Sequence, residues 1–172
     1  MKKVLQQGEA DGLCGIYATL NFLNRTDWKD WVDHGLRALI DAARQFGWFT
    51  PQHLIDGFED HQIKAILDLQ FENYRMGYET YFLSDVVAGL KHSKFHEILE
   101  RVVAKRGSVI VHWDNKHGGH WLLVTGDAGV PIVCDSDDKK RPISPLKNRR
   151  IPSSEWGIVI LPCKRPVRQV NI

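Results

Sequence analysis

The sequence has few cysteines, and it lacks the patterns that bind metal ions or build disulfide scaffolds. Its 172 residues include only Cys14, Cys134 and Cys163, an odd and widely spaced set that does not form a paired disulfide framework. No CxxC or HExxH motif is present, so the eight histidines show no zinc-binding spacing. We therefore expect free thiols, no metal and no other cofactor.

Long apolar runs, repeats and low-complexity segments are also missing. No stretch approaches the roughly 18 apolar residues of a membrane-spanning helix, and the N-terminal residues turn polar by Gln6, which is not typical of a signal peptide. We expect no membrane association, and a protein that is cytoplasmic or secreted without a conventional signal peptide. The length suits a single domain, residues 1–172, with a sizeable core. The sequence does not predict an oligomeric state.

Charge is nearly balanced overall but uneven along the chain. The net charge is +2, whereas the part from Asp137 onward carries nine Lys and Arg against three Asp and Glu. A basic end can contact nucleic acid or an acidic partner. A solvated loop and tail explains the same pattern more simply, so we do not expect nucleic-acid binding.

Apolar periodicity predicts helices in the first part of the chain and strands in the last. The expected helices cover residues 14–25, 28–46, 51–67 (interrupted at Gly57) and 84–105. The expected strands cover residues 3–5, 108–113, 120–125, 130–134 and 155–161. Residues 70–81 are expected to be a loop or short strand, and residues 114–119 and 136–155 are expected to be loops. Residue types suited to helix ends are Thr26 or Asp27, Gly47, Thr50 and Ser84. This order predicts an α+β fold with an antiparallel sheet.

Cys14 stands between a polar loop and an apolar helical segment. The unpaired N–H groups of a first helical turn and the positive end of the helix dipole favour a thiolate there. A lone cysteine is more often a small buried hydrophobic residue. A catalytic role for Cys14 therefore requires a base elsewhere in the chain.

His120 is the predicted base, and Asp135 is its predicted partner. His120 follows the pair Gly118-Gly119 at the start of an expected strand, and Asp135 ends the next strand. Antiparallel pairing brings these two ends together, so the carboxylate can reach the imidazole if the register is right. Thiol catalysis needs such a base and a third group that orients it. The alternatives are His112 and His117 for the base, and Asp137 and Asp138 for the carboxylate.

The order of these residues resembles that of the papain-like cysteine peptidases. A Gln, then Cys-Gly at a helix start, then Gly-His-Trp on a strand and Asp after the following strand are similar to the compact bacteriocin-leader peptidases and Josephin deubiquitinases. The resemblance covers residues 7–24 and 107–137. It implies a papain-like fold, with the catalytic cysteine at a helix start packed on a C-terminal antiparallel sheet. It also implies that Cys14 is the nucleophile, His120 the base and Asp135 the orienting residue.

The resemblance implies that Gln7 supplies the oxyanion hole. Gln7 lies one residue farther from Cys14 than in the commonest pattern of that family, and Gln6 is an alternative. The run from Asp11 to Cys14 also resembles the Asp-Gly-x-Cys of ovarian-tumour-type deubiquitinases, in which the Asp end of the loop helps to form the oxyanion hole. The backbone N–H of Cys14 is expected to contribute in each case.

The sequence therefore predicts a thiol hydrolase that cleaves a peptide or isopeptide bond in a protein or peptide. Residues 70–81 and 114–119 are the expected substrate groove, and Trp121 is expected either to shield the His–Asp pair or to belong to the core. The same three residue types serve transglutaminase, deamidase and acyl-transfer chemistry in papain-like toxins and effectors. An alternative of another class is a catalytically inactive binding module, for example in a bacterial defence system.

Overall fold

The computed structural model describes residues 4–5, 12–26, 31–88, 94–115, 118–138, 142–148, 151, 154 and 156–163. Four helices precede the first strand: α1 (Cys14–Arg25), α2 (Trp31–Gln45), α3 (Pro51–Asp56) and α4 (Asp60–Asn73). Two more follow it, α5 (Leu83–Val87) and α6 (Phe95–Ala104), and a short 3-10 helix, η2 (Leu146–Asn148), lies near the end. None of the helices in these ranges is long and apolar enough to cross a membrane.

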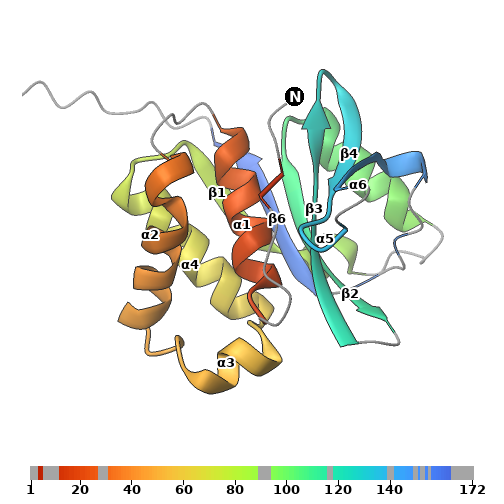
Figure 1. Cartoon of the computed structure of the whole chain (residues 1–172). Helices are drawn as coiled ribbons and strands as arrows, with labels where there is room; N and C mark the ends of the chain where they lie inside the picture. Colours follow the sequence, from red (N-terminus) through yellow and green to blue (C-terminus); the bar gives the residue numbers. More distant parts are fainter. Residues whose placement is uncertain are drawn as a thin grey trace, which may run out of the picture.

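Six strands form one sheet in which every pairing is antiparallel. They are β1 (Tyr78–Phe82), β2 (Ser108–Asn115), β3 (Gly118–Asp127), β4 (Val130–Cys134), β5 (Ile143–Pro145) and β6 (Gly157–Pro162). Their spatial order is β1-β6-β2-β3-β4-β5, so β2 to β5 form a meander and β6 returns between β1 and β2. The fold is therefore α+β, with helices first and the sheet after them (Figure 1).

The sheet is buried on both faces, which explains why its strands read as nearly continuous apolar runs. Trp121 and Leu123 of β3 join the core that includes α1, α2 and α4, whereas Leu122 and Val124 face a second core built with α6. Figure 1 shows α1 between the other N-terminal helices and the sheet. The start of α1 thus lies where the helical part meets the sheet.

Several predicted helix ends are confirmed. Helix α1 covers the predicted residues, and Gly47, with a φ of 74°, follows α2 in the left-handed conformation that glycine favours. Thr50 accepts a hydrogen bond from the N–H of His53 at the start of α3. Gly57, with a φ of 86°, separates α3 from α4. These ends are set by local chemistry, which the sequence displays directly.

Two predictions near α1 are wrong. Thr26 does not start the second helix, because its hydroxyl donates to the carbonyl of Leu23 at 2.6 Å and so closes α1; Asp27 lies outside the described residues. Residues 4–5 form no strand, because the N–H and carbonyl of Leu5 pair with the side-chain amide of Asn21 at 2.7 and 2.9 Å. In both places, side-chain hydrogen bonds satisfy backbone N–H or carbonyl groups: those of Leu5 and the carbonyl of Leu23.

The loop and helix boundaries in the middle of the chain also differ from the prediction. Within the range 70–81, which was expected to be a loop or short strand, the short strand is confirmed as β1, whereas residues 70–73 belong to α4. The predicted helix 84–105 is two helices, and Ser84 lies inside α5, which begins at Leu83. The segment 136–155 contains β5 and η2. Tertiary packing of apolar residues sets these boundaries. It overrides the local preference of polar residues such as Ser84 for helix caps and loops.

Candidate active site

Two close backbone contacts position Cys14 at the start of α1. The N–H of Gly12 donates to the carbonyl of Leu54 at 2.6 Å, and a Cβ at Gly12 would lie 2.7 Å from the backbone nitrogen of Gly57. A Cβ at Gly15 would lie 2.7 Å from Cδ1 of Ile63. Only glycine fits either position without a shift. The first turn of α1 is therefore held against the α3–α4 connection and α4.

The β3–β4 hairpin brings His120 and Asp135 together. Leu123 pairs with Cys134 in the register, and the turn uses Ala128 and Gly129 with positive φ angles of 48° and 80°, as a two-residue hairpin requires. Nε2 of His120 lies 2.9 Å from Oδ1 of Asp135. The contact predicted from strand register is thus present in the structure.

Asp135 is fixed by the backbone that follows it. The same Oδ1 atom accepts hydrogen bonds from the N–H groups of Asp137 at 3.0 Å and Asp138 at 3.2 Å. The two alternative carboxylates therefore belong to residues that hold Asp135 through their main chain. Because the carboxylate is constrained by several donors, it fixes the orientation of the His120 ring in turn.

The side chain of Cys14 is the second neighbour that raises the pKa of His120, after Asp135. Since Nε2 lies against Asp135, Nδ1 is the ring nitrogen left for proton transfer. Cys14 comes from the start of a helix, His120 from β3 and Asp135 from the residue after β4. Three segments that are distant in the sequence thus contribute side chains that influence one another: Asp135 is hydrogen-bonded to His120, and Cys14 raises the pKa of that histidine.

The electrostatics of this group favour a charged imidazole. Burial alone would lower the pKa of His120, but its hydrogen bonds to Asp135 and Cys14 and their negative charges raise the pKa to about 10. The side chains of His120 and Asp135 are only 12% and 8% exposed, so water screens the pair weakly. An imidazolium beside a thiolate is the resting state that thiol catalysis requires.

His112 and His117 are the two alternatives that the sequence offers for the base. The ring of His112 packs edge-on against Trp121, with centroids 4.9 Å apart, and His112 pairs with Trp121 across the strands while Trp113 pairs with His120. His117 lies outside the described residues. The same is true of Gln6, Gln7 and Asp11, the residues predicted to form an oxyanion hole.

The glycine pair before His120 does not act as a loop hinge. Gly118 and Gly119 belong to β3 and pair with Asn115 and Asp114 of β2, so His120 lies within a strand rather than at a loop–strand junction. The expected loop 114–119 is therefore wrong for residues 114–115 and 118–119, which belong to strands, and residues 116–117 lie outside the described part of the chain. Extended pairing at the sheet end explains the difference, because glycines in a strand allow another backbone to approach closely.

The expected substrate groove at residues 70–81 is not near Cys14. Tyr78 contacts Phe22, with ring centroids 5.4 Å apart, and Phe22 lies two turns along α1 from Cys14, about 12 Å at 1.5 Å per residue. Trp121 is a core residue: it is 3% exposed, and its indole N–H donates to the carbonyl of Phe58 at 3.0 Å. Sequence reasoning placed the aromatic residues of 70–81 at the wrong end of the helix.

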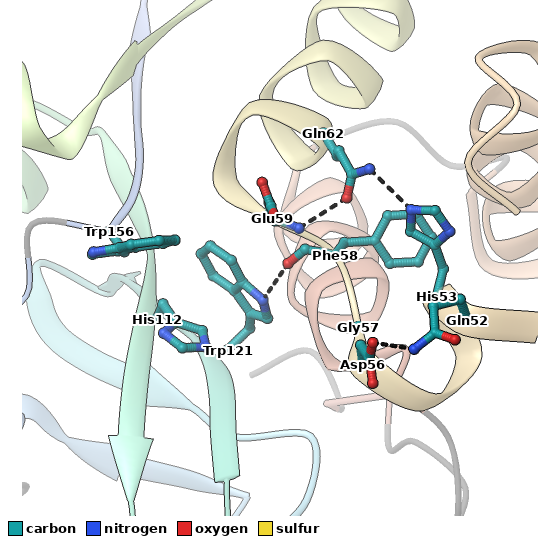
Figure 2. Close-up of a pocket in the computed structure, with 10 residues that line it drawn as sticks. All are labelled: Gln52, His53, Asp56, Gly57, Phe58, Glu59, Gln62, His112, Trp121 and Trp156. Atoms are coloured by element: carbon teal, nitrogen blue, oxygen red, sulfur yellow. Dashed lines mark hydrogen bonds between the residues drawn. The ribbon is translucent and has the colours of Figure 1, made fainter. Parts of the chain in front are cut away.

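A cavity of about 300 Å³ lies between the α3–α4 connection and the sheet. Figure 2 shows His112, Trp121 and Trp156 on the sheet side and Phe58, Glu59 and Gln62 among the residues opposite. The sequence does not predict this cavity, because its walls come from three separate segments. Trp156 is 56% exposed, which only the structure reveals.

Within the described ranges, no group of three or more His, Cys, Asp and Glu side chains is placed to hold a metal ion. Fold and site together define an α+β protein in which a strand histidine is hydrogen-bonded to an aspartate and its pKa is raised by a cysteine at a helix start. No protein-family model and no curated protein matches the sequence. The placement of Cys14, His120 and Asp135 is therefore the basis for inferring a function.

Proposed function

We propose that this protein is a papain-like thiol hydrolase that cleaves peptide or isopeptide bonds through Cys14, His120 and Asp135. The observation that carries the proposal is the hydrogen bond between His120 and Asp135, together with the effect of the Cys14 side chain on the pKa of the same histidine. An isolated buried cysteine needs no such partner, and a structural histidine needs no thiol beside it. The arrangement has the nucleophile, base and orienting group of a catalytic triad.

In the first half of the proposed reaction, the Cys14 thiolate attacks the carbonyl carbon of the scissile amide. The oxygen becomes an oxyanion, which the N–H of Cys14 is placed to stabilise, together with the positive end of the α1 dipole. As the C–N bond breaks, the imidazolium of His120 transfers the proton on Nδ1 to the leaving nitrogen. An amine departs and the acyl group remains on sulfur as a thioester.

In the second half, neutral His120 takes a proton from a water molecule that attacks the thioester carbonyl. The C–S bond then breaks, an acid is released and the thiolate–imidazolium pair is restored. Asp135 does not need to accept a proton in this cycle, because its role is to orient the ring and stabilise its charged form. If an amine replaces water, the same intermediate gives acyl transfer.

An activity-based electrophile screen tests the proposal. The protein is treated with a ubiquitin-type probe and with a small peptide-like probe, and the adduct is located by mass spectrometry. We expect labelling at Cys14, loss of labelling in Cys14→Ala, and at least a hundredfold slower labelling in His120→Ala. Cys134→Ala is the matched control and should label like the wild type.

The same variants are then assayed for cleavage of a substrate that responds to the wild-type protein. Release of a free acid indicates hydrolysis, whereas transfer to an added amine indicates the acyl-transfer alternative. The proposal is contradicted if Cys14→Ala and His120→Ala both retain wild-type activity. An unreactive Cys14 would instead favour a binding module.

A further inference from the structure

The cavity between the α3–α4 connection and the sheet adjoins the first turn of α1. Trp121, which lines the cavity, also lies 3.2 Å from the position that a Cβ on Gly15 would take. Gly57, another lining residue, packs against Gly12 on the other side of Cys14. Both walls of the cavity therefore reach the residues that flank the nucleophile. A peptide bound with its carbonyl at Cys14 has this cavity as a neighbouring space for one of its side chains.

The sheet side of the cavity presents aromatic faces. His112 lies between two tryptophans, with ring centroids 4.9 Å from Trp121 and 6.4 Å from Trp156. The backbone N–H of His112 donates to the carbonyl of Trp156 at 3.0 Å, which ties the exposed tryptophan to β2. Figure 2 shows these rings together on one side of the cavity. Tryptophan faces attract cations more strongly than the other aromatic side chains do.

The helical side carries negative charge. The ten lining residues include Asp56 and Glu59 and contain no lysine or arginine. The amide of Gln52 donates to Asp56, and Glu59 lies 3.2 Å from the exposed His61, so neither carboxylate is paired with a lysine or arginine in these contacts. A ligand group that complements this wall carries positive charge.

The remaining polar wall is held by an internal network. Oε1 of Gln62 accepts from the N–H of Glu59 at 2.9 Å, so its amide nitrogen donates to Nε2 of His53 at 3.0 Å. The other ring nitrogen of His53, Nδ1, lies 2.8 Å from the hydroxyl of Thr50. Both ring nitrogens of His53 thus have hydrogen-bond partners inside the protein.

We infer that this cavity binds a positively charged side chain of the substrate, arginine or lysine, beside the bond that Cys14 attacks. The cation would lie against the face of Trp156 and opposite Asp56 and Glu59. The inference rests on the proposed function, because it assigns the substrate class of the same site. The inference predicts that the cavity selects a substrate side chain by its positive charge as well as by its size.

The test uses matched peptide-like electrophiles that differ in one side chain: arginine, its neutral isostere citrulline, leucine or glutamate, placed in turn at each position next to the reactive group. The rate of Cys14 adduct formation is measured by intact mass. At one position we expect the arginine probe to react about tenfold faster than the citrulline probe. Lysine should behave like arginine there, and glutamate should react most slowly.

Variants then assign this preference to the cavity. The double variant Asp56→Asn/Glu59→Gln and the variant Trp156→Leu should each bring the arginine-to-citrulline ratio close to one. Glu97→Gln, which removes a carboxylate on α6 that pairs with Arg101, is the control and should keep the full ratio.

The possible outcomes separate the two claims. If Cys14 reacts with these probes but does not distinguish arginine from citrulline at any position, the inference is wrong while the proposed function stands. A preference that survives both cavity variants also overturns it, because the selectivity then arises elsewhere. If no probe labels Cys14 in preference to Cys134 and Cys163, the proposed function and the inference fail together.

Discussion

Cys14 and Cys134 are both buried, with exposed fractions of 8% and 2%, but their surroundings are opposite in character. Cys134 lies on β4 opposite Leu123, and burial raises the pKa of its thiol despite the opposing effect of Arg25. Cys14 begins a helix and meets the charged ring of His120. Burial alone therefore does not decide whether a cysteine is inert; its partners do.

The carboxylate of Asp135 influences the surroundings of both Cys14 and Cys134. Asp135 follows Cys134 directly, and after the larger effect of burial its negative charge raises the pKa of that thiol further. On its other side, the same charge helps to raise the pKa of His120 above its ordinary value. Asp135 thus favours the protonated thiol at Cys134 and the imidazolium that pairs with Cys14.

The largest expected effect comes from removing this charge. Asp135→Asn should reduce turnover by a factor on the order of 10² to 10⁴, because the ring of His120 loses its orienting acceptor and its charged form is less stable. Steady-state kinetics on a responsive substrate measure the loss. Asp127→Asn is the matched control, since Asp127 influences the Cys134 thiol and makes no predicted contribution to catalysis. Equal losses in both variants would contradict the assignment.

A smaller effect is expected from Gly12→Ala. The added Cβ would meet the nitrogen of Gly57 at 2.7 Å and the carbonyl oxygen of His53 at 2.9 Å, and both are backbone atoms. We expect a loss of about 1–3 kcal/mol in unfolding free energy, together with lower activity as Cys14 shifts. Denaturant unfolding provides the measurement.

Gly126→Ala is the control for Gly12→Ala. Gly126 lies near the end of β3 that is distant from His120. Its Cβ would meet only one side-chain atom, Cγ1 of Val103, at 3.2 Å. We expect a smaller loss of stability and unchanged activity per folded molecule. If Gly12→Ala proves as mild as Gly126→Ala, the α3–α4 connection does not position Cys14.

A third expected effect is a pH dependence of stability. The pKa of His120 rises from 6.5 to about 10 on folding, so the folded state holds this proton more tightly. The resulting stabilisation is complete below about pH 6.5 and is lost as the pH rises through about 10. Asp135→Asn removes part of the shift, so the stability difference from wild type should be largest near pH 6 and shrink towards pH 10. Urea unfolding at several pH values measures it, and a difference that grows with pH would contradict this account.

The sequence predicted those parts of the molecule that local chemistry determines. The start of α1 at Cys14, the break at Gly57 and the β3–β4 hairpin follow from residues that stand next to one another. The contact between His120 and Asp135 followed from the same reasoning, because a short turn fixes the register of two antiparallel strands.

The remaining features depend on contacts between distant segments. Nothing near Tyr78 in the sequence indicates that it packs on Phe22, far from Cys14. The cavity likewise needs Phe58, Trp121 and Trp156 from three segments. The strand order, with β6 between β1 and β2, is also set by packing on both faces of the sheet. Residue types next to one another in the chain carry little information on such placements.

The rate of alkylation of each cysteine by iodoacetamide, measured as a function of pH, tests the central claim most directly. We expect Cys14 to react faster than Cys134 and Cys163 at mildly acidic pH, because His120 stands beside it as a base. In His120→Ala, the reactivity of Cys14 at that pH should fall at least tenfold. The account is contradicted if Cys14 reacts no faster than Cys134 and Cys163, or if its reactivity does not depend on His120.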